Sequence, residues 1–345
     1  MTKANYERAV RPSQEGGRRV LTHEPCPVCD VRQARIAYDI EGLMSQLVTC
    51  ESCGTGRLFP LPSEAEIATF YPEEYYGNPA AAKFLFPVEW FVRLIGGRHV
   101  RLFLRGLPPA ARVLDLGCGR GVLLRAIAER GFEAHGVEAN AAAAQGCDPR
   151  AEVRIASRLA EARYPAAFFD EVVIWHVLEH LRDPRDTLEE VRRILRPGGR
   201  LVVAVPNFAS AQARWAGPDW FHLDLPRHLF HFPLSALVRL LERSGFEIGS
   251  RHHFSLRQNP FGWIQSLLNK STLPRNGLYT LLHDRAGGVE GAAHAFDPVT
   301  RLKLVAGGAL ALPPALLLGL LEALFRTGAT VHVVARTASP PHSNA

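Results

Sequence analysis

The feature that most constrains the fold is a glycine-rich turn between a buried strand and a helix. Residues 112–116 read RVLDL, an apolar run with one acid, and the turn GCGRG (117–121) follows directly. Glycines allow positive φ and a close approach of the backbone to a ligand, and the helix expected at 122–130 offers free N–H groups at its start. The turn therefore predicts a ligand site at the carboxyl end of a strand.

Strand and helix signals alternate along much of the chain. Strands are expected at 112–116, 133–137, near Val153, and at 170–175, 200–206, 245–256 and 330–337, and helices at 122–130, 186–195 and 233–244. Strands that alternate with helices at this spacing form a largely parallel sheet covered on both faces. The predicted fold class is α/β, a Rossmann-like, doubly wound and mostly parallel seven-stranded sheet, preceded by a small zinc-ribbon-like module.

Two acids give the glycine turn its chemical character. Asp115 ends the first of these strands, and Glu138 ends the next one, 17 positions after Gly121. A glycine turn alone also fits a dinucleotide site. The carboxylate of Asp115 at the strand end, however, suits a cationic, amine-bearing ligand better than a pyrophosphate. Glu138 lies in the range of acids that bind ribose hydroxyls.

These motifs resemble the class I S-adenosylmethionine (SAM) dependent methyltransferases. Matching stretches are FFDEVVIWHVLEHLRDP (168–184), LRPGGRLVVAVPN (195–207) and DLPRHLFHF (224–232). By this resemblance Asp115 and the glycines hold the methionine part of SAM, Glu138 takes the ribose hydroxyls, and Ile174, Trp175 and His176 line the sulfonium side. The implied cofactor-binding set is Asp115, Gly117, Cys118, Gly119, Gly121, Glu138, Ala139, Trp175 and His176. Relatives often carry an adenine-binding acid after the third strand, where this chain has Ser157 and Arg158. We therefore expect adenine contacts from the backbone or Leu159.

Two cysteine pairs lie near the N-terminus. Cys26 and Cys29 form one CxxC knuckle, and Cys50 and Cys53 form another after 20 intervening residues. This spacing predicts a structural four-thiolate zinc site; disulfides, idle thiols or a redox pair are the alternatives. The arrangement resembles bacterial methyltransferases that place a zinc-binding domain before the SAM domain, some of which act on nucleotide-linked sugars, often at carbon. Ribosomal RNA methyltransferases with an N-terminal zinc module are the second resemblance.

Two histidines are candidate catalytic bases. His176 follows the fourth strand, and His228 lies in the stretch after the fifth, beside Arg227, which could hold an anionic group of the substrate. His176, Glu179 and His180 are spaced to share one helical face, which would allow a second metal, although a purely structural role is the alternative. A structural role for His228 is open as well.

A domain division follows from composition. We expect a disordered N-terminus (1–22), the zinc module (23–62), a helical connector (63–105), the methyltransferase core (106–258), an apolar insertion (259–328), and a final strand and tail (329–345). The insertion is uncharged over the 18 residues 304–321. Pro313 and Pro314 are expected to break it, leaving a helix of about 18 Å, too short for a bilayer core of about 30 Å. It would form a lid or a membrane-surface helix.

The composition excludes few classes of binding partner. The net charge is +6 and the basic residues form no dense run, so nucleic acid is not the expected partner. The first residues lack the apolar core of a secretory signal, and we expect a cytoplasmic location with membrane-surface contact as an option. The predicted function is methyl transfer to a small molecule: a nucleotide-linked sugar, a glycan or a lipid-linked intermediate. An rRNA or tRNA methyltransferase and a SAM-binding module without activity are the alternatives.

Overall fold

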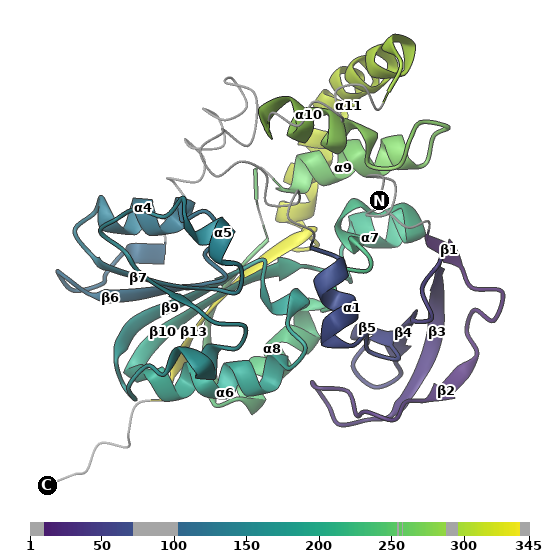
Figure 1. The fold of residues 1–345 in the computed structure, drawn as a ribbon. Coiled ribbons are helices and arrows are strands. Elements are labelled where there is room, and N and C mark those ends of the chain that lie inside the picture. The colour runs from purple at the N-terminus through teal and green to yellow at the C-terminus, as the bar shows by residue number, and fades with distance from the viewer. Residues whose placement is uncertain (1–9, 72–102, 254, 257, 288–295, 339–345) are drawn as a thin grey trace, which may run out of the picture. The chain divides into compact units, whose positions relative to one another are not determined.

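A computed structural model describes residues 10–71, 103–253, 255–256, 258–287 and 296–338 (Figure 1). The chain divides into two compact units. Unit 1 comprises Met1–Arg93, Pro206–Ala236 and His252–Val331, and unit 2 comprises Leu94–Val205, Leu237–Arg251 and His332–Ala345. The units cut across the linear division expected from composition, because the cysteine-bearing segment, the stretch after the fifth parallel strand and the apolar insertion all belong to unit 1.

A seven-stranded sheet with the order β12-β13-β10-β9-β6-β7-β8 forms the centre of the α/β fold. Its strands are β6 (Arg112–Leu116), β7 (Glu133–Glu138), β8 (Glu152–Ile155), β9 (Phe169–Trp175), β10 (Leu195–Pro206), β12 (Phe246–His252) and β13 (Thr330–Thr337). The four pairings among β10, β9, β6, β7 and β8 are parallel. The prediction of a mostly parallel, seven-stranded Rossmann-like sheet is confirmed.

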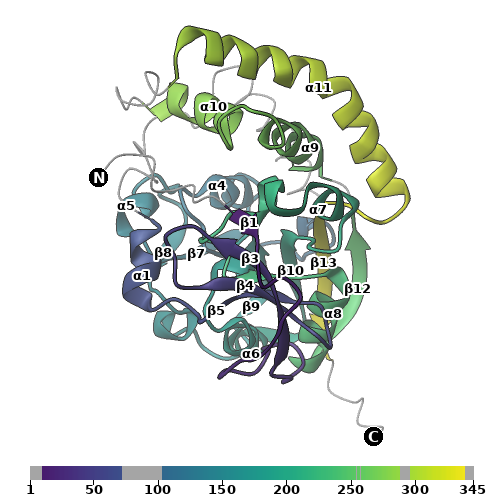
Figure 2. The ribbon, with the colours of Figure 1, turned by 90° about the vertical axis from the view of Figure 1, so that its right-hand side faces the viewer.

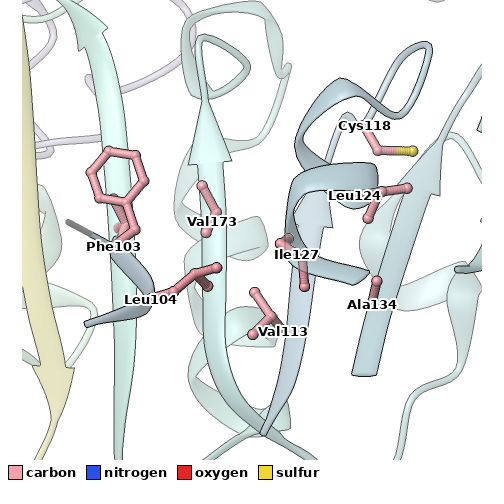
Figure 3. Packing of buried hydrophobic residues seen from close by; sticks show 9 residues of the cluster. Phe103, Leu104, Val113, Cys118, Leu124, Ile127, Ala134 and Val173 are labelled. Atoms are coloured by element: carbon pink, nitrogen blue, oxygen red, sulfur yellow. The ribbon is translucent and has the colours of Figure 1, made fainter. Parts of the chain in front are cut away.

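Helices cover both faces of this sheet. Figure 1 shows α4 (Val122–Ala128) and α5 (Ala141–Ala144) on one face and α6 (Pro184–Ile194) and α8 (Leu234–Arg243) on the other. The central strands β6, β9 and β10 contain buried apolar runs because both faces of the sheet are covered there. Figure 3 shows Leu124 and Ile127 of α4 directed at Val113 and Ala134 of the sheet, where all four side chains are buried.

A second sheet lies in unit 1, with the order β1-β3-β4-β5-β11 and β2 paired to β3. Its strands are β1 (Val10–Pro12), β2 (Arg19–Leu21), β3 (Gln33–Ile40), β4 (Gln46–Cys50), β5 (Gly56–Phe59) and β11 (Phe230–His231). The expectation of disorder over 1–22 is wrong for residues 10–12 and 19–21, which pair with β3 and so satisfy their backbone groups. Residues 1–9 lie outside the described part.

The connector expected at 63–105 is described only at its ends. Helix α1 (Glu64–Thr69) begins at Ser63, whose side chain and that of Glu66 form a capping box. The aromatic residues Tyr75 and Tyr76 lie outside the described residues. At the far end, Phe103 and Leu104 are buried against the large sheet of unit 2.

The apolar insertion is a layer of helices in unit 1. It contains α9 (Gln258–Asn269), α10 (Gly277–Gly287) and α11 (Pro298–Leu324), and it follows α7 (Ala211–Ala216) and two short 3₁₀ turns, η4 (Gly217–Asp219) and η5 (Phe221–Leu223). Figure 2 shows α11 with α9 and α10 along one side of it. Among the described residues, α11 is the helix long and apolar enough to cross a membrane by length and composition.

The expected break at Pro313 and Pro314 is wrong, because α11 runs through both prolines. A proline inside a helix removes one backbone hydrogen bond and costs about 3 kcal/mol. Here the packing of Ala311 and Ala315 into a buried cluster with Trp263 and Leu268 of α9 holds the flanking turns in place. With 27 residues the helix is about 40 Å long. It is therefore longer than a bilayer core of about 30 Å, and its length does not exclude that it spans a membrane.

The buried ion pair between Glu171 and Arg200 leads to a prediction about stability. The Nε atom of Arg200 donates to Glu171 at 2.6 Å, and Glu171 is fully buried. Burial, opposed by Arg200, raises the pKa of Glu171 to about 7. We expect Arg200→Met to lower the free energy of unfolding by about 3–5 kcal/mol at about pH 8, since it leaves an unpaired buried carboxylate. The loss should shrink toward about pH 5.5, where the carboxyl group is protonated.

The control is Arg196→Met on the same strand. Arg196 pairs with Asp170 at 2.6 Å, but its side chain is 43% exposed. An exposed pair contributes less than about 1 kcal/mol. Urea unfolding at both pH values measures the two variants, and equal losses would contradict the assignment of Glu171 and Arg200 as the dominant pair.

Candidate functional site

The glycine turn after β6 has the strained backbone that its sequence predicts. Gly117, Gly119 and Gly121 have φ values of 74°, 52° and 71°. A Cβ atom at Gly117 would lie 2.5 Å from Cγ2 of Val177, whereas one at Gly119 would meet no atom of the described residues within 4 Å. The turn is therefore closed by protein at Gly117 and open at Gly119, where a ligand can approach the backbone.

Glu138 fixes the turn from the neighbouring strand. One carboxylate oxygen accepts the N–H of Gly119 at 2.9 Å, and the other accepts the N–H of Asn140, also at 2.9 Å. The carboxylate is thereby held beside the open face of the turn. Each oxygen keeps a second lone pair for a ligand hydroxyl. Ala139, the next residue of the predicted set, is exposed.

Asp115 is the electrostatic centre of this region. It is only 4% exposed, and burial together with the nearby charge of Glu138 raises its pKa to about 8. A buried carboxyl group with a raised pKa becomes ionised when a cationic ligand supplies the missing counter-charge. The arrangement is therefore suited to a ligand that carries an ammonium group next to hydroxyl groups.

Two residues of the predicted set point their side chains elsewhere. Cys118 packs in the core near Leu124 (Figure 3), and its pKa is raised by burial, so it can serve a ligand only through its backbone. The ring of Trp175 lies against Phe103 and His332, with centroids 5.0 and 4.5 Å away. Trp175 thus belongs to an aromatic cluster at the β9–β13 side of the sheet.

His176 has an unusual backbone and a defined partner. Its φ is 54°, and its N–H donates to Ala204 O at 2.9 Å. Nδ1 lies 3.2 Å from Oε1 of the buried Glu179, and Nε2 is buried without a hydrogen bond to any described residue. When Nδ1 carries the proton, as a carboxylate partner favours, Nε2 can accept one.

The helical face expected for His176, Glu179 and His180 does not form. His176 precedes a short 3₁₀ turn, η3 (Leu178–His180), and the following helix α6 starts only at Pro184. A left-handed residue at position 176 ends the strand before any helical turn begins. The contact of Glu179 with the His176 ring agrees with the structural role that the sequence analysis kept as the alternative to a metal.

His228 lies in unit 1, in the other compact unit, and has its own contacts. Its Nδ1 is 2.9 Å from the carbonyl oxygen of His222, and its Nε2 is 3.7 Å from a carboxylate oxygen of Asp224. The same carboxylate pairs with Arg227, so the charge expected to hold an anionic substrate group already has a partner. His231, also buried, bonds Leu223 O at 2.9 Å.

The four cysteines of the two knuckles converge in unit 1. The Sγ atoms of Cys26 and Cys53 are 3.6 Å apart, those of Cys29 and Cys50 are 3.5 Å apart, and all four lie within 4.8 Å of one another. All four are free thiols, which removes the disulfide alternative in this structure. Sulfur atoms around a tetrahedral zinc at about 2.3 Å lie about 3.8 Å apart, so the cluster fits this metal.

Arg57 supports this cluster and was not predicted. Its buried guanidinium donates to the carbonyl oxygens of Glu24 and Pro25, at 2.9 and 2.7 Å, and also to the hydroxyl of Thr22. These bonds fix the chain just before Cys26. No sequence signal marks Arg57, because a single arginine in a strand is indistinguishable from an exposed one.

The geometry can be compared with known proteins. Residues 91–250 match the family model of a methyltransferase domain. This segment contains the glycine turn, Glu138 and His176. The chain is 35% identical over 143 residues to a protein of Mycolicibacterium smegmatis named a probable S-adenosylmethionine-dependent methyltransferase, covering 39% of this chain and 52% of that protein.

A second relative carries a more specific name. The chain is 35% identical over 105 residues to the ubiquinone biosynthesis O-methyltransferase of Alkalilimnicola ehrlichii, covering 28% of this chain and 42% of that protein. The chain thus spans about half the length of these relatives. A solved phosphoethanolamine N-methyltransferase 2 of Haemonchus contortus, in complex with SAM, aligns with a TM-score of 0.50 and 16% identity over 83% of this chain and 62% of that one. This likeness concerns the fold.

Proposed function

We propose that this chain binds SAM and transfers its methyl group to a small-molecule acceptor. The observation that carries the proposal is Asp115, a buried carboxyl group with a raised pKa at the end of β6, beside an open glycine turn and the fixed carboxylate of Glu138. An amine and ribose hydroxyls on one ligand match these groups. The methyltransferase names of the relatives support the same assignment.

Each residue of the site would bind a different part of SAM. SAM, when bound, supplies a methyl group on an electrophilic sulfonium. Asp115 would balance the charge of the ligand amine. Glu138 would accept ribose hydroxyls with the lone pairs that Gly119 and Asn140 leave unused. The open side of Gly119 provides the approach.

Proton removal from the acceptor is assigned to a histidine. His176 is our first candidate, since Glu179 orients its ring and its Nε2 is buried without a bond to the described residues. His228, the first choice from sequence, has its Nδ1 held by His222 in a similar way and is the second candidate. Either imidazole would take the proton on Nε2 as methyl transfer proceeds.

The acceptor class is part of the proposal. We infer a nucleotide-linked sugar, a glycan or a lipid-linked intermediate, because the relatives with specific names act in ubiquinone biosynthesis and the basic excess is small. RNA is the competing acceptor. Incubation with labelled SAM and separate panels of nucleotide sugars, lipid extract and ribosomal RNA distinguishes the classes, and label in RNA alone would overturn our choice.

We also propose that Cys26, Cys29, Cys50 and Cys53 hold a structural zinc ion. Their sulfur atoms are spaced as tetrahedral ligands, and Arg57 fixes the chain beside them. The hydrogen bond between the Cys26 and Cys53 thiols lowers the pKa of Cys53 and raises the pKa of Cys26, so that one sulfur of this pair carries negative charge readily. In a sheet with a small core, a metal at this position supplies much of the folding free energy.

The pH dependence of SAM binding tests the role of Asp115. In the ligand-free protein its pKa is about 8, so an ammonium ligand must first displace a proton. We expect the affinity for SAM, measured by calorimetry, to rise about tenfold from about pH 6 to 7.5, where an α-amine is still mostly protonated. Asp115→Asn should weaken binding and flatten this dependence. The exposed control Asp186→Asn should behave like wild type; a flat wild-type profile would contradict the model of a charge-paired amine.

Metal analysis tests the cysteine site. Purified protein should contain about one zinc per chain, and Cys29→Ser should lose it, whereas Cys147→Ser, a cysteine outside the cluster, should keep it. Removal of zinc by a chelator should accelerate amide hydrogen exchange in β3, β4 and β5, because the knuckles hold the ends of these strands. Metal-free protein with unchanged exchange would disprove a structural zinc.

Paired histidine variants test the base. Once an acceptor is found, His176→Asn should reduce turnover about 100-fold while SAM affinity stays near the wild-type value. His228→Asn is the matched comparison. Loss of turnover in His228→Asn alone would move the assignment to His228, and wild-type turnover in both would exclude a histidine base.

A further inference from the structure

Helix α11 has an apolar surface that the proposed reaction does not use. Its buried residues form one narrow stripe that faces α9 and α10: Leu304, Gly308, Ala311, Ala315, Gly319 and Glu322. With 100° per residue, Leu310, Leu317 and Leu324 lie opposite this stripe. They are 80%, 59% and 73% exposed. An exposed leucine is ordinary by itself, but a continuous row of them marks an interaction surface.

The exposed side of α11 contains no charged residue between Leu304 and Leu321. Leu312, Leu316, Leu318 and Leu320 extend the apolar surface around the flanks of the helix, toward both edges of the buried stripe. A partner helix covers an arc of about 100° and would leave much of this surface in water. A lipid phase surrounds the whole exposed circumference.

Charge is confined to the ends of the apolar stretch. Lys303 and Arg301 lie in the first turns of α11, and Arg326 follows its last turn. Trp215 of α7 lies nearby in unit 1: it is 44% exposed, and its ring is 5.3 Å from Trp263, which packs in the same cluster as Ala311 and Ala315. Basic residues and tryptophan beside an apolar stretch are typical of contact with lipid headgroups.

We propose that α11 docks unit 1 on the surface of an anionic bilayer, with the face of Leu310, Leu317 and Leu324 among the acyl chains. An in-plane position follows from the fold. The opposite stripe of α11 packs on α9, and Glu322 near its C-terminal end accepts the N–H of Gln212 at 3.0 Å. Strand β13 begins at Thr330, directly after residues 325–329. A helix so tied along its length and at its end lies on the membrane and does not cross it.

The proposal is independent of the methyl-transfer chemistry. It concerns where the protein resides and rests on the exposed composition of α11 and of the residues beside it. It does give a lipid-carried acceptor a physical route to the protein, because docking would bring the enzyme to the phase in which such a molecule is dissolved.

Vesicle flotation of the whole 345-residue chain tests the proposal. Wild type should float with phosphatidylcholine vesicles that contain phosphatidylglycerol, and less with phosphatidylcholine alone, because Arg301, Lys303 and Arg326 would favour anionic headgroups. The double variant Leu310→Glu/Leu317→Glu should lose about 100-fold in partitioning. The matched control Leu21→Glu/Met44→Glu changes two residues of unit 1 that are 71% and 90% exposed, against 80% and 59% for Leu310 and Leu317, and it should float like wild type.

The remaining outcomes decide against the proposal. Wild type that stays with the free protein on all vesicles, or a Leu310→Glu/Leu317→Glu variant that floats unchanged, would overturn it. A wild-type dimer in lipid-free sedimentation that this variant dissociates, without vesicle binding, would assign the surface to a second copy of the chain. SAM affinity and unfolding midpoint should match wild type in every variant. If the double variant is misfolded, the single change Leu324→Glu, in the last turn, repeats the test.

Discussion

The burial of the Asp115 carboxyl group near the end of strand β6 determines which ligands suit the candidate site. Asp115 pairs in register with Val173 of β9 and Gly136 of β7, so it lies in the middle of the parallel sheet. Desolvation there disfavours its charge, and Glu138 on the adjacent strand adds to the penalty. Both acids are buried, and a nearby positive charge would stabilise their ionised forms.

The parallel register also explains the shape of the site. Because β6 and β9 are neighbours, the turn after β6 and the residues after β9 meet at one edge, where Val177 packs against Gly117. Any side chain at Gly117 would separate them. His176 is placed by the same meeting of strand ends, and its left-handed backbone directs the chain into η3. Such strain costs about 1–2 kcal/mol and is found where function holds a residue in place.

Unit 1 is assembled from three stretches that are far apart in sequence. Strand β11, only two residues long, completes the sheet that bears the cysteines, and Leu58 N–H bonds Leu229 O at 3.0 Å beside it. The segment around His228 is therefore held by the cysteine-bearing sheet and by the helical layer of α7 and α9, where Gln212 donates to Asn259 O at 3.1 Å. A zinc ion bound at the cysteines of this sheet would therefore also stabilise the segment around His228, which is a candidate substrate-binding segment.

The sequence by itself determined what local patterns encode. Apolar strand runs, the glycine turn, the acids Asp115 and Glu138 and the two CxxC knuckles predicted the sheet and the residues around the turn, because each depends on neighbours close in the chain. Only the tertiary structure decided the rest. The pairing of β1 and β2 with β3, the pairing of β11 with β5 and the hydrogen bonds of the Arg57 guanidinium all join residues that no local period connects. Helix α11 is the clearest case: local chemistry predicts a break at Pro313, and packing of its small-residue stripe against α9 keeps it continuous.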